Sequence, residues 1–324
     1  WPAHNLPHDL WQEILGLLPL EDQTRLAHTS HHVQDIVEQL APQALDPTAH
    51  TTPDFTRTIY TQTELNTSLN ENRSLHFIPG TDSNLTIGQG WPHVHGPGTL
   101  TAVTGGTVDA QDGVRINTVT GGWVNAFGTT IDTVSRGNLR AYRQTRIAEV
   151  TGGIVDGHNE AVIDKMTGGT VQAYDQTTVG TMTGGTIHTG GQATITTVTD
   201  GEVFANGQAS IEEVTGGNIE AREQATITTI TGGTVYAREQ VTITTVTGGT
   251  ITATDNATIT AASGDTHITA HGNAQVTIQA GADGVHVDAY DTAHITAHNG
   301  TITLHSPDVT ITSNTDSNTV ISHA

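Results

Sequence analysis

Apolar and polar positions alternate along most of this chain in a pattern that repeats every sixteen residues, from about Val103 to Ala262. One unit reads VTGGTITATDNATITA, and its opening apolar position recurs from unit to unit. The residues at that position are Val103, Val119, Val134, Val150, Met166, Met182, Val198, Val214, Ile230 and Val246. A fixed period this short, without a helix-length apolar stripe, is typical of stacked β-coils. The pattern therefore predicts a mainly β protein, a parallel β-solenoid with coils of sixteen residues.

Each unit is predicted to contain two short strands. In the first, typified by Thr170–Tyr174, Val171 and Ala173 alternate with polar or aromatic neighbours; in the second, typified by Ala225–Thr229, apolar residues alternate with threonine. Successive side chains of a strand point to opposite faces, so the Val, Ile and Ala residues are expected in the lumen. The recurring Thr-Gly-Gly supplies a corner, because glycine tolerates positive φ angles. The crossover rule favours a right-handed coil.

The pattern divides the chain into four parts: a helical module at 1–45; a linker, cap helix and first irregular coils at 46–98; the solenoid at 99–312; and a polar C-terminal tail at 313–324. Within the second part, Thr63 is expected to cap a short helix that runs to about Asn70. Such a helix would cover the N-terminal end of the lumen and shield an unpaired strand edge. Beyond Ala262 the period loosens, and the coils are expected to end near Thr312.

The first part, from Asn5 to about Ala44, has apolar residues at helical spacing and predicts three short helices. Its motif comprises Leu6-Pro7, Leu10, Ile14-Leu15, Leu18-Pro19, Asp22, Leu26 and Thr29-Ser30. In order and spacing this motif resembles an F-box, although His31-His32 stand where that family usually has a basic residue.

The resemblance implies a docking module, because F-boxes bind a Skp-type adaptor of a cullin ubiquitin ligase while a repeat domain captures the substrate. The residues at the positions that would face the adaptor are Leu6, Pro7, Leu10, Ile14, Leu15 and Leu18. The alternative is that these residues only form the core of a helical bundle that covers one end of the solenoid.

Composition narrows the function classes. The net charge of −22 argues against direct contact with nucleic-acid backbones or anionic membranes. The chain has no cysteine, which excludes disulfides and leaves the compartment undecided, with the cytoplasm favoured. No apolar run approaches the length that spans a membrane.

Aromatic residues are confined to one strand of the repeat. All seven that follow residue 98 are predicted to lie on outward positions of the first strand of their coil. Exposed aromatic residues interleaved with Arg and His on a rigid sheet are typical of a recognition surface. The predicted partner-binding residues are Trp123, Phe127, Arg140, Tyr142, His158, Tyr174, Phe204, Arg222, Tyr236, Arg238 and Tyr290. The alternative is that the rings only stack as ladders that stabilise the sheet.

Other candidate sites are weaker. Arg136, Arg140, Arg143 and Arg146 crowd one coil, where they would bind an anion or pair with acids such as Asp132 and Glu149. His93 and His95 share a strand face, but a third metal ligand is not evident, and no metal or cofactor is predicted. Asp109 and Asp156 fall in one outward column but three coils apart, about 14 Å, which is too far for paired carboxylate catalysis. His267, His271, His294 and His298 lie outward at the far end and are expected to titrate near neutral pH.

The sequence therefore favours a non-catalytic recruitment protein that binds protein partners, among them a Skp-type adaptor. Three alternatives stay open. One is a structural or self-assembling rod, joined through its free strand edges into dimers or filaments. Another is an acidic inhibitor that mimics DNA. The third is an ice-binding solenoid, suggested by the Thr-x-Thr rows of the second strand, which Arg115, Arg146, Asp164 and Glu212 interrupt.

Overall fold

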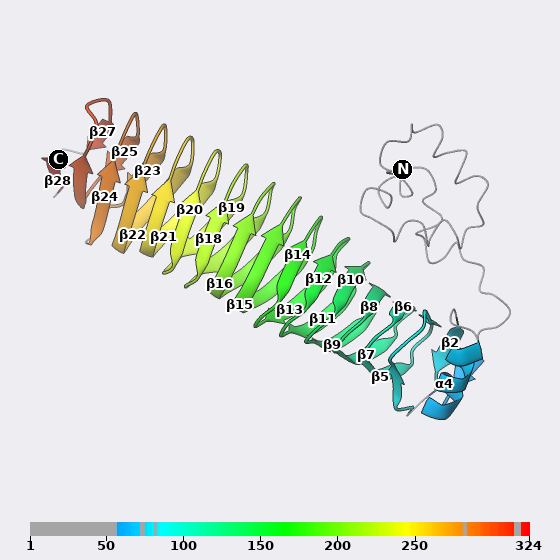
Figure 1. The fold of residues 1–324 in the computed structure, drawn as a ribbon. Coiled ribbons are helices and arrows are strands. Elements are labelled where there is room, and N and C mark those ends of the chain that lie inside the picture. The colour runs from blue at the N-terminus through cyan, green and yellow to red at the C-terminus, as the bar shows by residue number, and fades with distance from the viewer. Residues whose placement is uncertain (1–56, 72–74, 81–82, 281–283, 314–318) are drawn as a thin grey trace, which may run out of the picture. The chain divides into compact units, whose positions relative to one another are not determined.

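The computed structural model describes residues 57–71, 75–80, 83–280, 284–313 and 319–324 (Figure 1). The chain divides into two compact units, and residues 59–75 and 79–324 form the solenoid unit. The other unit contains the predicted helical module, which lies outside the described residues. The described elements that precede the coils are β1 (Arg57–Ile59), α4 (Gln62–Glu71) and β2 (His76–Pro79).

The solenoid unit is a parallel β-solenoid, as the sixteen-residue period predicts. Its coils stack two sets of parallel strands, which we name the variable stack and the threonine stack. The variable stack contains β4 (His93–Val94), β6 (Thr107–Gln111), β8 (Trp123–Phe127), β10 (Asn138–Tyr142), β12 (Ile154–Gly157), β14 (Thr170–Ala173), β18 (Asn218–Ala221), β20 (Thr234–Ala237), β24 (Val285–Ala289), β26 (Thr301–Leu304) and β28 (Val320–His323).

The threonine stack contains β3 (Leu85–Ile87), β5 (Thr99–Val103), β7 (Arg115–Val119), β9 (Thr130–Val134), β11 (Arg146–Val150), β13 (Val162–Met166), β17 (Ser210–Val214), β19 (Thr226–Ile230), β23 (Gln275–Ile278), β25 (His294–Ala297) and β27 (Thr310–Ser313). Four longer strands turn the corner and contribute to both stacks: β15 (Thr178–Thr189), β16 (Thr194–Ala205), β21 (Thr242–Ala253) and β22 (Thr258–Ala270).

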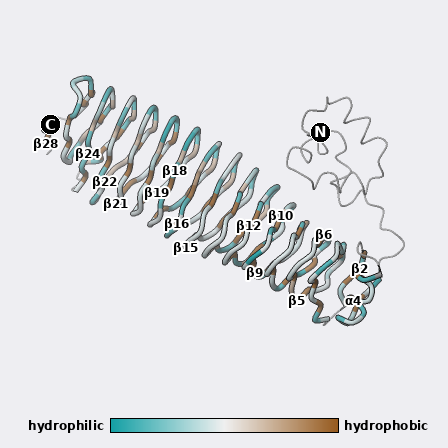
Figure 2. Tube along the Cα trace, viewed as in Figure 1, coloured by the Kyte–Doolittle hydropathy of each residue, from teal (hydrophilic) through white to brown (hydrophobic). Residues whose placement is uncertain are grey.

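The lumen is filled by the apolar positions of the repeat. The opening column is fully buried in every coil, including Met166 and Met182, and so are the paired Val and Ala of the variable stack. Figure 2 shows the result as hydrophobic and hydrophilic residues alternating along each strand. Register is exact in this region: Ile227 pairs with Ile211 in the preceding coil and with Ile243 in the next. Identical or similar side chains therefore stack along the axis, and the lumen needs no side chain larger than Ile, Leu or Met.

The two glycines of each Thr-Gly-Gly corner meet different constraints. The second, such as Gly169 with φ +84°, adopts a left-handed conformation that side chains disfavour. The first, such as Gly168, would place a Cβ atom 2.7 Å from the carbonyl oxygen of Thr151 in the preceding coil. The second position therefore requires glycine because of its φ angle, and the first because the preceding corner leaves no room for a Cβ atom.

The helix predicted before the first coil is present as α4, but it begins earlier. Its N-cap is Thr61 rather than Thr63, because the Thr61 hydroxyl accepts a hydrogen bond from the Glu64 amide at 3.2 Å. The Gln62 side chain then acts as a strand partner for β3. Its Oε1 accepts from the Thr86 amide at 2.7 Å, and its Nε2 donates to the Thr86 carbonyl at 2.9 Å. One side-chain amide thus satisfies backbone groups of β3. This is the shielding of a strand edge that we predicted for a cap helix.

The C-terminal segment differs from the prediction of a polar tail from residue 313. Strand β28 lies within it and pairs in parallel with β26, so that Ile302 faces Ile321. The β-branched pair Val320-Ile321 is enough to extend the sheet once a preformed strand offers backbone partners. Val320 is 59% exposed and Ile321 44% exposed, in keeping with their position on the last described strand. Residues 314–318 lie outside the described residues.

Candidate recognition surface

The outward side of the variable stack has three positions per strand. In β8, Val124 and Ala126 point into the lumen, while Trp123, Asn125 and Phe127 point outward. The register carries these three positions from coil to coil, and we name them the first, middle and last columns. Asn125, for example, continues the middle column from Asp109 to Arg140. Each outward residue is therefore a rung with one neighbour in the coil before it and one in the coil after it.

The structure places every predicted solenoid-face residue outward on the variable stack, although in different columns. Trp123 lies in the first column; Arg140, Phe204 and Tyr236 lie in the middle column; and Phe127, Tyr142, His158, Tyr174, Arg222, Arg238 and Tyr290 lie in the last column. Trp123 and Tyr236 are the most open of the aromatic residues on these columns, at 48% and 43% exposed. Their role in binding stays a prediction.

Four rings of the last column stack on one another. The centroid of Phe127 lies 4.9 Å from that of Tyr142, which lies 5.3 Å from that of His158. His158 in turn lies 5.1 Å from Tyr174, and all three interplanar angles are 20° or less. Offset stacking of this kind stabilises adjacent strands. The ladder interpretation of these rings therefore has a geometric basis, and a ladder with its edges in solvent is also a rigid platform for a ligand.

The middle column of the early coils is polar and buried, since Asp109, Asn125, Arg140 and Asp156 are each at most 9% exposed. Arg140 is therefore not the exposed side chain that the sequence predicted. Asp109 accepts a hydrogen bond from Asn125 Nδ2 at 2.6 Å and another from Trp91 Nε1 at 3.0 Å. His93 Nδ1 lies 3.2 Å from the same carboxylate. Trp91 was missed by the sequence analysis, because it stands outside the regular repeat and has no periodic signal. These bonds satisfy a carboxylate that is 8% exposed, as buried charges require.

Arg140 separates the two aspartates of this column. Its Nε lies 3.8 Å from Asp156, and its guanidinium lies 5.9 Å from the centre of the Trp123 ring, in cation–π range. Asp109 and Asp156 thus share a column with Asn125 and Arg140 between them, and they do not form a catalytic pair. The Tyr174 pKa is raised, first by burial of the phenol and then by the charge of Asp156.

The predicted arginine patch is divided between the two stacks. Arg146 lies on the threonine stack, where its Nη2 pairs with Asp164 at 2.9 Å, whereas Arg140 lies on the variable stack. The acids expected as partners bind other cations: Asp132 pairs with Arg115 at 2.7 Å, and Glu149 with Lys165 at 3.0 Å. The rung-to-rung ion pairs of the early threonine stack also break the flat row of threonines that an ice-binding surface needs.

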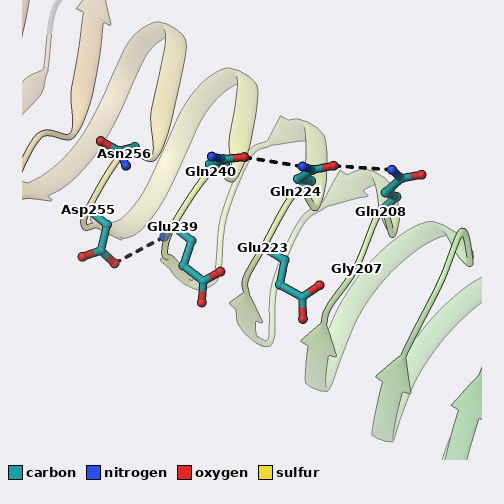
Figure 3. A pocket seen from close by; sticks show the side chains of 8 residues that line it. All are labelled: Gly207, Gln208, Glu223, Gln224, Glu239, Gln240, Asp255 and Asn256. Carbon is teal, nitrogen blue, oxygen red and sulfur yellow. Dashed lines mark hydrogen bonds between the residues drawn. The ribbon is translucent and has the colours of Figure 1, made fainter.

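A row of glutamines along the turns was not anticipated from the sequence. Gln192 donates to Gln208 at 3.2 Å, Gln208 to Gln224 at 3.4 Å, and Gln224 to Gln240 at 3.5 Å. Figure 3 shows Gln208, Gln224 and Gln240 of this row beside Glu223, Glu239 and Asp255, with which they line a shallow groove. The sixteen-residue spacing of Gln in the printed sequence is the signal that could have found it. Amide ladders are a stabilising device, and we assign this one no ligand.

With this geometry established, comparison with known proteins adds one finding. Residues 4–42 match the F-box domain family. The match confirms the resemblance drawn from the leucine and proline spacing, and it covers the helical module alone. No curated protein and no solved structure matches the chain. The described residues contain no helix long and apolar enough to cross a membrane.

The F-box match gives the protein a protein-interaction module ahead of a solenoid. The residues predicted to face an adaptor, Leu6, Pro7, Leu10, Ile14, Leu15 and Leu18, fall within the matched segment and lie outside the described residues. An F-box is an interaction module rather than a catalytic one. The described solenoid carries the three columns of the variable stack, whose role in binding stays a prediction.

The buried His95 imidazole, at the start of the last column, is expected to make the stability of the fold depend on pH. Its pKa is lowered from 6.5, mainly by burial and then by the neighbouring His93, against opposing effects of Asp112 and Asp109. The unfolded chain therefore binds the proton more tightly, so this residue favours the fold above pH 6.5 and loses that contribution as the pH falls through the lowered pKa. We expect the urea midpoint of the His95→Gln variant to fall less than that of the parent between about pH 7.5 and about pH 5. An equal or larger fall in the variant would contradict this account.

Proposed function

We propose that this protein is a non-catalytic recruitment protein, in which the F-box docks on a Skp-type adaptor and the variable stack binds a second protein. The observation that carries the proposal is the contrast between the two stacks. The outward positions of the threonine stack are mostly threonine in the later coils and charged in the early ones, and the described strands that belong to it alone carry no Trp, Tyr or Phe. The three columns of the variable stack change from coil to coil among aromatic, basic, acidic and amide residues. Lumen packing does not require that variety, because both stacks fill the lumen with the same small set of apolar residues.

The chemistry of the variable stack suits protein recognition. Tyr, Trp and Arg are the residue types that dominate the binding energy of protein interfaces. Here they project from strands whose backbone is fixed by neighbours on both sides, so little conformational entropy is lost on binding. Arg222 and Arg238 both pair with Glu220, which holds two long side chains against the sheet beside Tyr236. A net charge of −22 favours a partner with a basic surface around the aromatic contacts. Location in the cytoplasm is part of the proposal.

The adaptor half is tested with purified components. The full chain is expected to bind a purified Skp-type adaptor, and the Leu10→Ala/Leu18→Ala variant is expected to lose most of that binding. The Trp123→Ala/Tyr236→Ala variant serves as the matched control and should bind the adaptor as the parent does. Retention of adaptor binding by the leucine variant, with its helical content unchanged by circular dichroism, would refute docking through these residues.

The solenoid half is tested by affinity capture followed by direct binding measurements on the captured partner. The Trp123→Ala/Tyr236→Ala variant is expected to weaken binding by at least about 30-fold, since each aromatic hot spot contributes about 1–2 kcal/mol or more. Tyr60→Ala is the control, because Tyr60 is 60% exposed but lies outside the variable stack. Equal recovery of the partner by both variants would mean that the columns are structural ladders only.

Two exposed apolar residues of β28, Val320 and Ile321, favour a second function, self-association. Within the described residues β28 pairs with β26, and an apolar edge strand is the feature that joins sheets edge to edge. Sedimentation velocity distinguishes the two functions. A rod that assembles through β28 gains mass with concentration, and the Ile321→Lys variant abolishes that gain, whereas a pure recruitment protein stays at constant mass. A DNA mimic is disfavoured, because Asn125 and Arg140 separate the acids of the middle column.

A further inference from the structure

Histidines and an aspartate converge on the variable stack at the coils of β22, β24 and β26, which follow the coils of Trp123 and Tyr236. His267 lies on β22 and pairs in register with His286 on β24, nineteen positions later. Asp288 follows His286 by two residues, so it points to the same side of the sheet. The two imidazole rings stack, with centroids 5.1 Å apart and planes 12° apart. Two nitrogen donors from adjacent coils thus lie beside one carboxylate.

The donor atoms are spaced as metal ligands are. His267 Nε2 lies 3.3 Å from Asp288 Oδ2, and His286 Nε2 lies 3.5 Å from Asp288 Oδ1. All three ligand atoms lie within 4.8 Å of one another. Tetrahedral Zn²⁺ with bonds of about 2.0–2.1 Å separates its ligands by about 3.4 Å, so both histidine–aspartate distances already match. The two nitrogens lie within 4.8 Å of one another, and the two stacked rings have to tilt toward a common point to bind one ion.

A third histidine orients the carboxylate. His305 Nε2 lies 3.1 Å from Asp288 Oδ1, and the His305 ring stacks on Tyr290 with centroids 4.3 Å apart. Tyr290 stacks in turn on His271 at 4.4 Å. Ligating carboxylates in metal sites are usually held by hydrogen bonds from such outer residues. The last-column stack therefore fixes His305, and His305 fixes Asp288.

Ion pairing alone does not account for this convergence. Three imidazoles surround one carboxylate, so more rings converge on Asp288 than a single ion pair requires. Two imidazoles and one carboxylate suit Zn²⁺ and neighbouring transition metals, whereas Mg²⁺ and Ca²⁺ prefer oxygen donors alone.

We propose that His267, His286 and Asp288 bind a divalent transition-metal ion of the Zn²⁺ class, with His305 as the residue that positions Asp288. The His267 and His286 side chains are 46% and 39% exposed, which leaves the fourth coordination position open to water. The ion would join β22 to β24 where the coil step departs from sixteen residues. It would thereby stabilise the irregular last coils.

The site is tested on the full chain, stripped of metal with a chelator, by titration with Zn²⁺ in a calorimeter and with Co²⁺ by visible absorption. The parent is expected to show a saturable site and the intense absorption of tetrahedral Co²⁺. The His267→Asn/His286→Asn variant is expected to lose that absorption and at least about tenfold in Zn²⁺ affinity. The variant keeps both side chains polar but removes the ring stack between them, so circular dichroism has to show that its fold is unchanged.

The matched control is His294→Asn, which removes an exposed histidine of the same coils from β25 on the threonine stack. The control should keep the Co²⁺ spectrum and the Zn²⁺ affinity of the parent. The His305→Gln variant should keep the spectrum but bind Zn²⁺ more weakly, which separates a positioning residue from a ligand. A Co²⁺ spectrum that survives in the double variant, or a parent that binds neither ion, would overturn the site.

Discussion

The Ile227→Ala variant is expected to lower the free energy of unfolding by about 2–5 kcal/mol. Ile227 is fully buried in the lumen and stacks between Ile211 and Ile243, so removing its outer carbons leaves a cavity that neighbours on both sides border. A coil cannot collapse to fill the gap, because the backbone bonds of adjacent coils hold the strands at a fixed spacing. Urea unfolding followed by circular dichroism measures the change.

Two further variants test whether the loss of stability comes from the cavity in the lumen. Ile227→Val removes one methyl group and is expected to cost about 0.5–1.5 kcal/mol. Thr228→Ala changes the adjacent exposed residue and is expected to change stability by no more than about 0.5 kcal/mol. If Thr228→Ala destabilises the protein as much as Ile227→Ala, the assignment of inward and outward positions on β19 is wrong.

The Gly169→Ala variant is expected to destabilise the solenoid by roughly 2–4 kcal/mol, the sum of backbone strain and close contact. Gly169 has φ +84°, and a Cβ atom there would lie 2.8 Å from the carbonyl carbon of Gly152 and from the carbonyl oxygen of Gly153. These atoms belong to the backbone of the preceding corner and cannot move aside as a side chain does. The change in thermal midpoint or urea midpoint reports the loss.

Gly113→Ala separates the two contributions. Gly113 has nearly the same φ, +83°, but a Cβ atom there would have no atom within 4 Å. Its substitution is therefore expected to cost about 1–2 kcal/mol, for the conformation alone. Equal losses for the two alanine variants would show that close stacking of the corners contributes nothing.

Both predictions concern the lumen and the corners, which recur from coil to coil. These recurring parts hold the strands from which the outward residues of the proposed binding surface project. A corner glycine with positive φ and a small apolar lumen recur from coil to coil and fix the backbone, so outward residues change without altering the fold. Arg140, Phe204 and Tyr236, for example, occupy the same middle column in different coils. A repeat of this kind separates the residues needed for folding from those available for binding, as is general in solenoid proteins.

Several features of the candidate surface followed from the period alone. Alternation put Val124 and Ala126 inside and Trp123 and Phe127 outside, and the structure agrees. The same reasoning placed Asp109 and Asp156 in one column. It succeeded because strand geometry leaves only two faces, and a constant period leaves only one neighbour above and one below each residue. Where the period is constant, the position of a residue in the sequence therefore identifies its neighbours in the adjacent coils.

The contacts that the sequence did not predict lie where the period changes or ends. His286 and His305 were not linked to His267, because the coil steps there depart from sixteen residues and hide the shared columns. Trp91 was not linked to Asp109, and the polar tail was not recognised as containing β28. In each case the contact joins the repeat to a segment that lacks it, and no periodic signal specifies the pairing.

By itself, the sequence determined that the chain forms parallel coils, which residues fill the lumen, which face outward, and that an F-box-like module comes first. Only the tertiary structure decided which outward groups meet: Arg140 with Asp156 and Trp123, Gln62 with the edge of β3, and His267 with His286 and Asp288. The physical reason is that the backbone period sets the direction of each side chain. The length and rotation of that side chain, together with the register of the irregular coils, set what it touches.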